Sequence, residues 1–264
     1  MKKVLSFVLL ALLATPEVFA DDPKARAIMQ KVDARDEGDN MTARMEMILI
    51  DKNGDTRARE IRQYKKDFGP DTYRLLFFLE PADVRGTGFL TYDYDDGAKD
   101  DDQWLYLPAL KKSKRIASTD KSGSFMGSDF TYSDMTSRDL DDYRFKLVKE
   151  MAVGAHKVWV IESTPRTQKV IDETGYTKSL ALVRQDNYVV IRAVHYETKA
   201  GRVKFLDIPK LEKIDGIWQA LEMQMTSKQG SDVIHRTVMR FHDVKFNQKL
   251  DENLFTQRRL ESGL

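Results

Sequence analysis

Residues that could carry out catalysis are few and scattered in this chain of 264 residues. It has no cysteine, and no serine lies in the Gly-x-Ser-x-Gly motif that exposes a hydrolase nucleophile. Of its four histidines, His235 and His242 share one predicted strand, but their odd spacing turns them to opposite faces, where they cannot bind one metal. We therefore expect a protein that is not an enzyme and that has no metal and no cofactor.

An acidic run from Asp93 to Asp102 contains six aspartates in ten residues and suggests a calcium site. The spacing does not fit that chemistry. With Gly97 at the glycine position of an EF-hand loop, Tyr92 takes the place of the first ligand, and no glutamate follows at the last position. We interpret the run as a solvated hairpin loop.

A more informative pattern is the stretch from Trp104 to Met135, which begins as a strand and continues into a basic segment. A Ser/Thr/Gly/Asp loop follows, and the chain turns apolar again at Phe125 and Met126. A short helical segment comes next, for which Ser128 or Asp129 is the candidate N-cap. Bulky apolar residues beside a flexible basic loop are typical of a flap over a hydrophobic cavity. A long hairpin connection whose Phe and Met fill an ordinary core would give the same pattern. The basic residues are Lys111, Lys112, Lys114 and Arg115.

The first twenty residues are typical of an export signal. Met1-Lys2-Lys3 is a cationic start, Val4 to Ala14 is an apolar run too short to span a bilayer, and Val18-Phe19-Ala20 fits a signal peptidase. We predict a signal peptide over residues 1–20, with cleavage after Ala20, and one domain over residues 21–264. An exported chain without disulfides suggests a bacterial periplasm.

The charge balance argues against nucleic-acid binding. Removal of the signal takes away two of the 43 cations and one of the 42 anions, which leaves the mature chain formally neutral. A nucleic-acid binder that works through a global positive field is therefore not expected.

Helical periodicity is clear at the start of the mature chain. Asp22-Pro23 fits a capped helix start, and Ala25, Ile28, Met29 and Val32 recur on one face of a helix that we expect to end near Gly38. From Met41 the period changes to two. The residues on one face of this strand are Met41, Ala43, Met45, Met47 and Leu49.

Hairpin signals follow one another along the rest of the chain. Asn53-Gly54 predicts a type I′ turn, and the returning strand, Thr56 to Lys65, is polar on both faces, which predicts a solvated or edge strand. Tyr73, Leu75, Phe77 and Leu79 then share one strand face. We count about ten or eleven strands without crossover helices, which predicts an antiparallel barrel or sandwich.

Several motifs resemble one known family. GSFMGSDFTYSDM follows WLYLPALKKSKRI, GTGFL occupies Gly86 to Leu90, and weaker similarity continues at Ile214 to Trp218 and at Leu250 to Thr256. Together they resemble the periplasmic outer-membrane lipoprotein-sorting family, relatives of the Lol-pathway carriers. This resemblance implies an incomplete antiparallel β-barrel closed by helices at one mouth, which carries acylated or other hydrophobic cargo without catalysis. It also implies an association with large proton-driven exporters of the inner membrane.

We therefore predict a mainly β protein, a half-open antiparallel barrel with an N-terminal helix and a small helical lid near residues 119–140. It would bind lipid or acylated lipoprotein cargo and pass it towards the outer membrane, with an inner-membrane RND-type exporter and an outer-membrane acceptor as its partners. The predicted cavity and lid residues are Phe77, Leu79, Phe89, Trp104, Tyr106, Phe125, Met126, Phe130 and Met135. The residues predicted to contact a partner or a head-group are Lys111, Lys112, Lys114 and Arg115.

Two alternatives belong to other functional classes. One is an accessory subunit with a filled core that docks on an RND-type exporter through the basic loop and carries nothing. The other is a hydrolase whose catalytic residues the sequence does not reveal. A cavity separates the carrier from the docking subunit, and convergent polar groups inside it would favour the enzyme.

Overall fold

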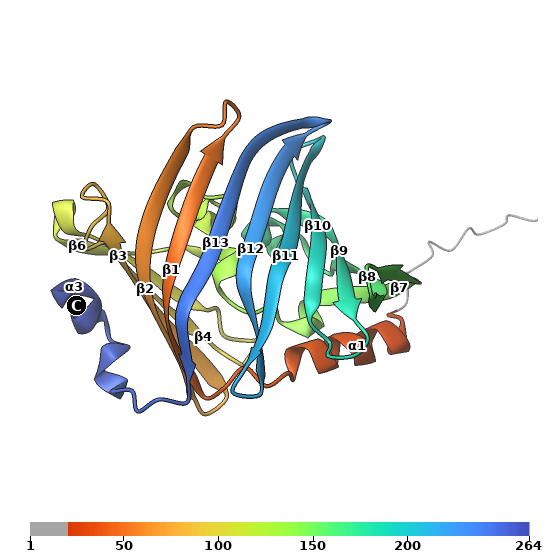
Figure 1. Ribbon diagram of the computed structural model, residues 1–264, viewed down its shortest axis with the longest axis horizontal. Helices are drawn as coiled ribbons and strands as arrows, with labels where there is room; N and C mark the ends of the chain where they lie inside the picture. The colour runs from red at the N-terminus through yellow and green to blue at the C-terminus, as the bar shows by residue number, and fades with distance from the viewer. Residues whose placement is uncertain (1–20, 264) are drawn as a thin grey trace, which may run out of the picture.

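A single antiparallel sheet of thirteen strands dominates the computed structural model, which describes residues 21–263 (Figure 1). The predicted signal peptide lies outside these residues. The sheet order is β6-β5-β4-β3-β2-β1-β13-β12-β11-β10-β9-β8-β7, and β6 does not pair with β7. The prediction of a half-open antiparallel sheet is therefore confirmed. The strand count is thirteen, not ten or eleven, because the sequence pattern did not reveal the short polar strand β6 among others.

The strands are β1 (Asn40–Asp51), β2 (Thr56–Phe68), β3 (Asp71–Glu80), β4 (Gly88–Asp93), β5 (Asp102–Leu107), β6 (Lys112–Arg115), β7 (Tyr143–Val153), β8 (His156–Pro165), β9 (Tyr176–Arg184), β10 (Val190–Glu197), β11 (Arg202–Ile214), β12 (Ile217–Gln229) and β13 (Asp232–Phe246). The α-helices are α1 (Pro23–Asp33), α2 (Gln168–Thr174) and α3 (Gln257–Ser262). Six short 3₁₀ helices are η1 (Pro108–Leu110), η2 (Ser118–Asp120), η3 (Phe125–Gly127), η4 (Ser133–Met135), η5 (Leu140–Asp142) and η6 (Glu252–Leu254).

The N-terminal helix α1 forms where the sequence predicts it. The carboxylate of Asp22 accepts hydrogen bonds from the amides of Lys24 (2.9 Å) and Ala25 (3.3 Å), which satisfies two free donors of the first turn. Ala25 and Ile28 are buried in a cluster with Tyr143 and Phe145 of β7. The helix ends at Asp33, earlier than predicted. No helix between residues 21 and 263 combines the length and the apolar character that crossing a bilayer requires.

Two predictions about the first hairpin need correction. Gly54 has a positive φ of 92°, but Asn53 does not, so the connection is not a type I′ turn. The carboxylate of Asp51 instead accepts from the amides of Asn53 (2.8 Å) and Asp55 (3.1 Å) and organises a longer loop. Strand β2 is not an edge strand, because it pairs with β1 on one side and β3 on the other, and its Ile61 is fully buried.

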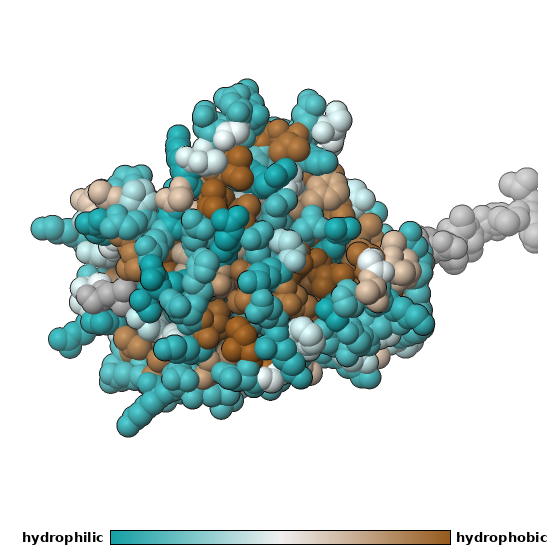
Figure 2. Space-filling view, in the orientation of Figure 1, coloured by the Kyte–Doolittle hydropathy of each residue, from teal (hydrophilic) through white to brown (hydrophobic). Residues whose placement is uncertain are grey.

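The two faces of the sheet have different coverings. We call the face that contacts residues 116–142 the inner face and the opposite one the outer face. On the inner face, Met45, Met47 and Leu49 of β1 cluster with Phe125 and Phe130, which confirms the predicted alternation of β1. The side of the molecule drawn in Figure 2 is mainly hydrophilic, with apolar residues in patches among the charged ones.

Four of the predicted cavity residues lie on the outer face. Phe77, Leu79, Trp104 and Tyr106 belong to a cluster with Phe255 and Leu260 of the C-terminal segment, whereas their strand neighbours Leu76, Phe78 and Leu105 belong to the inner cluster. Alternation along β3 and β5 separates the two sets. The predicted grouping of these four residues with the lid is therefore wrong. The C-terminal segment covers them, and a methyl group added at Gly88 would meet Leu260 at 2.6 Å.

We predict that Phe77→Ala destabilises the fold without weakening binding on the inner face. Phe77 is 1% exposed, and truncation of a buried Phe typically costs about 3–5 kcal/mol. Chemical denaturation measures this loss, and titration with an apolar fluorescent dye under native conditions should give the wild-type Kd. The partly exposed Leu79→Ala on the same face is the milder control. A Kd that rises with Phe77→Ala would contradict the assignment of this residue to the outer face.

Candidate functional site

The segment that covers the inner face is the connection between β6 and β7. We call residues 116–142 the lid. In Figure 1 it is yellow-green and lies behind the central strands. The fully buried Phe125 packs against Phe89 of β4, with ring centroids 5.0 Å apart, and Phe130 is also buried. The lid contains the 3₁₀ helices η2 to η5 and no α-helix, so the predicted helical turns are short and tight.

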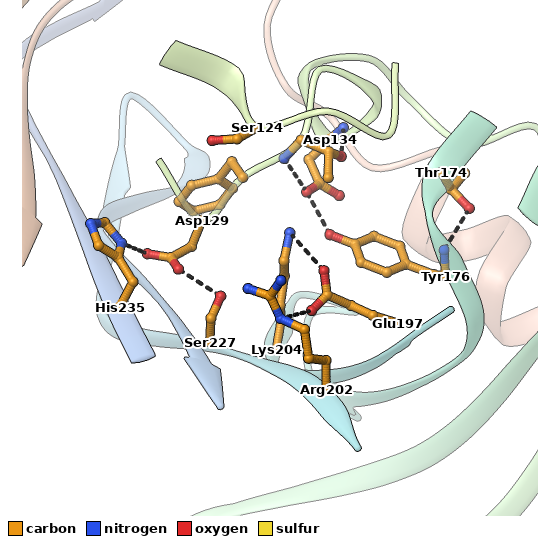
Figure 3. A network of polar contacts seen from close by, with 12 residues as sticks. Ser124, Asp129, Asp134, Thr174, Tyr176, Glu197, Arg202, Lys204, Ser227 and His235 are labelled. Atoms are coloured by element: carbon orange, nitrogen blue, oxygen red, sulfur yellow. Dashed lines mark hydrogen bonds and ion pairs between the residues drawn. The ribbon is translucent and has the colours of Figure 1, made fainter. Parts of the chain in front are cut away.

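A buried carboxylate fixes the middle of the lid to the sheet. Asp129 is 5% exposed, and its Oδ1 accepts a hydrogen bond from Ser227 Oγ of β12 (2.6 Å). Its Oδ2 lies 2.7 Å from His235 Nδ1 (Figure 3). The same oxygen accepts a hydrogen bond from Thr237 Oγ1 of β13 (2.7 Å). Sequence reasoning suggested a helix cap at Asp129. The carboxylate instead joins the lid to two distant strands, and hydrogen bonds to an ionised group are stronger than neutral ones.

A second carboxylate fixes the next turn of the lid. Asp134 Oδ2 accepts from the hydroxyl of Tyr176 on β9 (2.8 Å) and from the amide of Thr131 (2.8 Å). Burial would raise the pKa of Asp134, but nearby cations, Arg138 and Lys204 among them, and the Thr131 amide outweigh burial and lower it. Asp134 therefore remains an anion in the folded protein, and it ties the lid to the half of the sheet opposite β1–β6.

Further polar contacts hold the two ends of the lid. Near its start, buried Lys121 pairs with Glu173 of α2 at 2.7 Å. Near its end, Asp93 accepts from the amide (2.8 Å) and the hydroxyl (2.7 Å) of Ser137. The acidic run is thus only partly a solvated loop, because its first aspartate is a buried acceptor for the lid. Within residues 21–263, no group of three or more His, Asp or Glu side chains is placed to hold a metal ion.

Two adjoining cavities lie between the lid, α1 and the inner face. The smaller, of about 330 Å³, is mostly apolar and lies between α1, the lid and strands β7 to β12. The larger, of about 490 Å³, extends towards β1 to β4. Both are in the range of small-molecule sites. Residues that line both are Val32, Phe130, Asp134, Thr136, Val190, Leu206 and Met223.

The structure divides the predicted apolar site residues into three groups. Phe89, Phe130 and Met135 line the cavities. Phe125 and Met126 are lid residues that belong to the apolar layer between the lid and the sheet. The carbonyl oxygen of Met126 accepts a hydrogen bond from Arg59. The remaining four, Phe77, Leu79, Trp104 and Tyr106, are on the outer face as described above.

Sequence reasoning missed most of the cavity wall. The missed residues include Met29, Val32, Tyr143, Val190, Leu206 and Met223. Two of them carried a usable signal, since Met29 and Val32 belong to the apolar stripe of the predicted N-terminal helix. Part of that stripe faces the cavities and is not packed into the core.

The predicted contact residues lie together on an exposed hairpin away from the cavities. Lys111, Lys112, Lys114 and Arg115 are all exposed, and three of them are on β6, a strand at the edge of the sheet. Leu110 beside them is 63% exposed. Lys114 lies 3.5 Å from Asp120, and Arg115 pairs with Asp102. The structure thus brings these cations together on one edge, next to an exposed apolar side chain.

Comparisons with known proteins find this half-open antiparallel fold in solved structures. Residues 70–262 match the model of a family described only as an uncharacterized protein. An outer membrane lipoprotein-sorting protein domain from Vibrio parahaemolyticus is 35% identical, with a TM-score of 0.81 over 90% of this chain and 98% of that one. A DUF1329 family protein from Desulfovibrio piger is 31% identical, with a TM-score of 0.82 over 90% of this chain and 98% of that one.

The chain belongs to this Lol-like, outer-membrane lipoprotein-sorting family, which confirms the resemblance seen in its motifs. A LolA superfamily protein from Nitrosomonas europaea shares the fold at 20% identity, with a TM-score of 0.67 over 89% of this chain and 98% of that one. No curated protein matches the chain.

We predict that Asp129→Asn loosens the lid while the sheet stays folded. The substitution removes the charge that organises Ser227, His235 and Thr237, and a hydrogen bond to a charged group contributes about 1.5–3 kcal/mol. Hydrogen–deuterium exchange should become faster in peptides that cover residues 116–142 and stay unchanged in β11 to β13. Asp141→Asn is the control, since that lid side chain is 94% exposed. Equal acceleration in lid and sheet would show that Asp129 supports the whole fold and not the lid alone.

Proposed function

We propose that this protein is a periplasmic carrier that binds acyl chains of lipoproteins or other lipids and passes them towards the outer membrane. The observation that carries the proposal is the pair of adjoining apolar cavities, about 330 and 490 Å³, between the inner face and the lid. The family supports it, since a relative 35% identical is described as a lipoprotein-sorting protein domain. The predicted signal peptide and the absence of cysteine support the compartment.

Apolar burial supplies enough free energy for this task. Transfer of a methylene group from water to an apolar site is worth about 0.8 kcal/mol, so a long acyl chain gains on the order of 10 kcal/mol in full burial. Part of that gain is offset because the lid must move to admit the chain. The carrier therefore binds with moderate net affinity and releases its cargo to an acceptor with a better-fitting cavity.

The lid contacts suit a cover that opens and closes. The lid buries its apolar side chains Phe125 and Phe130 against the sheet. Its carboxylates Asp129 and Asp134 accept hydrogen bonds from side chains of the sheet. These side-chain contacts break without unpairing any strand. Cargo would enter beneath the lid, next to α1, and take the place of contacts that the cavity walls now make with one another.

We predict that Ala181→Trp closes the smaller cavity and weakens ligand binding. Ala181 of β9 lines this cavity, so an indole ring there would occupy the space of an acyl chain. The Kd for an apolar fluorescent dye should rise by at least about tenfold, or ~1.4 kcal/mol. The free energy of unfolding should change by less than about 1.5 kcal/mol, because the new ring enters open space and not a filled core.

The control for this variant is Ala152→Trp, an exposed position on β7 far from the cavity lining. It should leave dye binding unchanged. If the wild type binds neither dye nor lipid, and Ala181→Trp unfolds like an overpacked core, the space is a void in a non-carrying protein. The accessory subunit would then be the better account.

The basic hairpin is our candidate contact with the exporter or with anionic head-groups. We predict that replacement of Lys111, Lys112, Lys114 and Arg115 by Gln leaves the melting temperature nearly unchanged, because exposed charges contribute little to stability. Sedimentation with vesicles that contain phosphatidylglycerol should show weaker binding and a smaller dependence on salt. The control replaces exposed Lys146 and Lys149 of β7 and Lys157 of β8 by Gln, which removes three charges near the opposite edge of the sheet. Equal vesicle binding by both variants would leave the hairpin without this role.

A further inference from the structure

A polar cavity adjoins the smaller inner cavity. Five residues that line the smaller cavity also line this third cavity, of about 560 Å³, between α1, α2, the acidic loop and the end of the lid. These shared residues are Asp33, Thr136, Arg138, Leu140 and Tyr143. A ligand with its acyl chain in the apolar cavity would place its polar end at this junction.

Arg138 stands at the junction with unused hydrogen-bond donors. Within residues 21–263, its nearest anionic partner is Asp134 at 3.7 Å, beyond ordinary hydrogen-bond length. Its guanidinium lies over the rings of Tyr143 (5.9 Å) and Tyr176 (5.7 Å), which orient the group without using its N–H donors. Arg74, by contrast, donates to the carbonyl of Met135 (2.9 Å) and to Asp93 (3.2 Å).

Arg138 is also the one positively charged side chain among the described residues that line the smaller cavity. His195 lines it as well, but burial and the charge of Arg138 lower the pKa of His195 to about 3, so its imidazole is neutral. A guanidinium presents several donors in a fixed plane, which suits an oxygen acceptor. The polar end of a ligand would meet this group first.

The surrounding charge disfavours an anion at the same place. Nine carboxylate side chains and five cationic ones, Arg138 included, line the polar cavity. Burial is the main cause that raises the pKa of Asp33, of Asp101 and of Asp142, and neighbouring carboxylates add to it. Asp134 already opposes the charge of Arg138. A second carboxylate or a phosphate would be repelled, whereas a neutral oxygen would gain the hydrogen bonds at no such cost.

We propose that Arg138 binds the polar end of the cargo and that this end is an uncharged oxygen acceptor, such as an ester or amide carbonyl next to an acyl chain. Free fatty acids and lipids with an exposed phosphate are then poor ligands. The proposal rests on the proposed function, since it needs an acyl chain in the cavity. It assigns the carrier to neutral acylated molecules, either glycerol esters or the acylated end of a lipoprotein.

The test compares ligands with one acyl chain type and different heads. Palmitic acid, its glycerol monoester and palmitoyl lysophosphatidic acid compete with N-phenyl-naphthylamine, a neutral dye, for the full mature protein below their aggregation concentrations. The glycerol ester should bind about tenfold more tightly than either anion, a difference of ~1.4 kcal/mol. High salt should reduce this preference, because it screens the repulsion between the anions and the acidic wall. A lipopeptide with ester- and amide-linked chains separates an acylated protein end from a free glyceride.

Two variants assign the preference to the junction. Arg138→Met should weaken binding of the glycerol ester about tenfold and leave the Kd of the dye within about twofold, because the dye has no oxygen acceptor. Asp33→Asn should strengthen palmitate binding and leave the ester unchanged. Lys169→Met is the control, since its exposed amine pairs with Asp100 at the rim. Because Arg138→Met removes the cation that lies 3.7 Å from Asp134, the double variant Asp134→Asn, Arg138→Met repeats the test with neither charge.

The outcomes separate this inference from the proposed function. If the wild type binds neither dye nor any lipid, the carrier itself is wrong. If dye and lipids bind but palmitate competes as well as both the ester and the lipopeptide, the carrier function is supported. The preference for an uncharged head group is then wrong. If Arg138→Met and the double variant bind the dye and still bind the ester as the wild type does, Arg138 is overturned as the contact.

Discussion

The chain runs from β6 directly to β7, and these two strands lie at opposite edges of the sheet. Strand β1 pairs with β13 near the middle of the sheet. Strands β1 to β6 form a meander on one side of this pair, and strands β7 to β13 form a meander on the other. Residues 116–142 must therefore cross from one edge to the other. They cross on the inner face, where apolar side chains from both halves need a cover. The lid is thus a consequence of strand order.

Two kinds of contact hold this lid, and they differ in direction and strength. Phe125 and Phe130 contribute non-directional apolar burial, which an acyl chain could replace. Asp129 and Asp134 contribute directed hydrogen bonds to strands on both sides of the cavity, which a chain could not replace. A buried carboxylate is costly unless its partners satisfy it, so these anchors define one closed position. The apolar part supplies affinity, and the polar part sets where the lid returns after release.

Local patterns predicted much of the fold, because hairpins and helix starts depend on neighbours in the chain. The N-terminal helix, the half-open antiparallel sheet and the apolar face of β1 are examples. The sequence could not reveal which face of β3 is the inner one. Leu75, Leu76, Phe77 and Phe78 are all buried, because the C-terminal segment covers one face and the lid covers the other. Asp129 has partners about a hundred residues away on β12 and β13, so a local reading favoured a helix cap instead.

The central claim is that the inner cavities hold acylated cargo. Native mass spectrometry of the protein, purified from the periplasm of its own cells without detergent, tests it most directly, with lipid extraction to identify any bound molecule. The account predicts a population heavier than the mature chain by the mass of one neutral acylated molecule, and its loss in a variant with a filled cavity. A population that matches the bare chain, and that stays bare after incubation with lipid vesicles, would contradict the account.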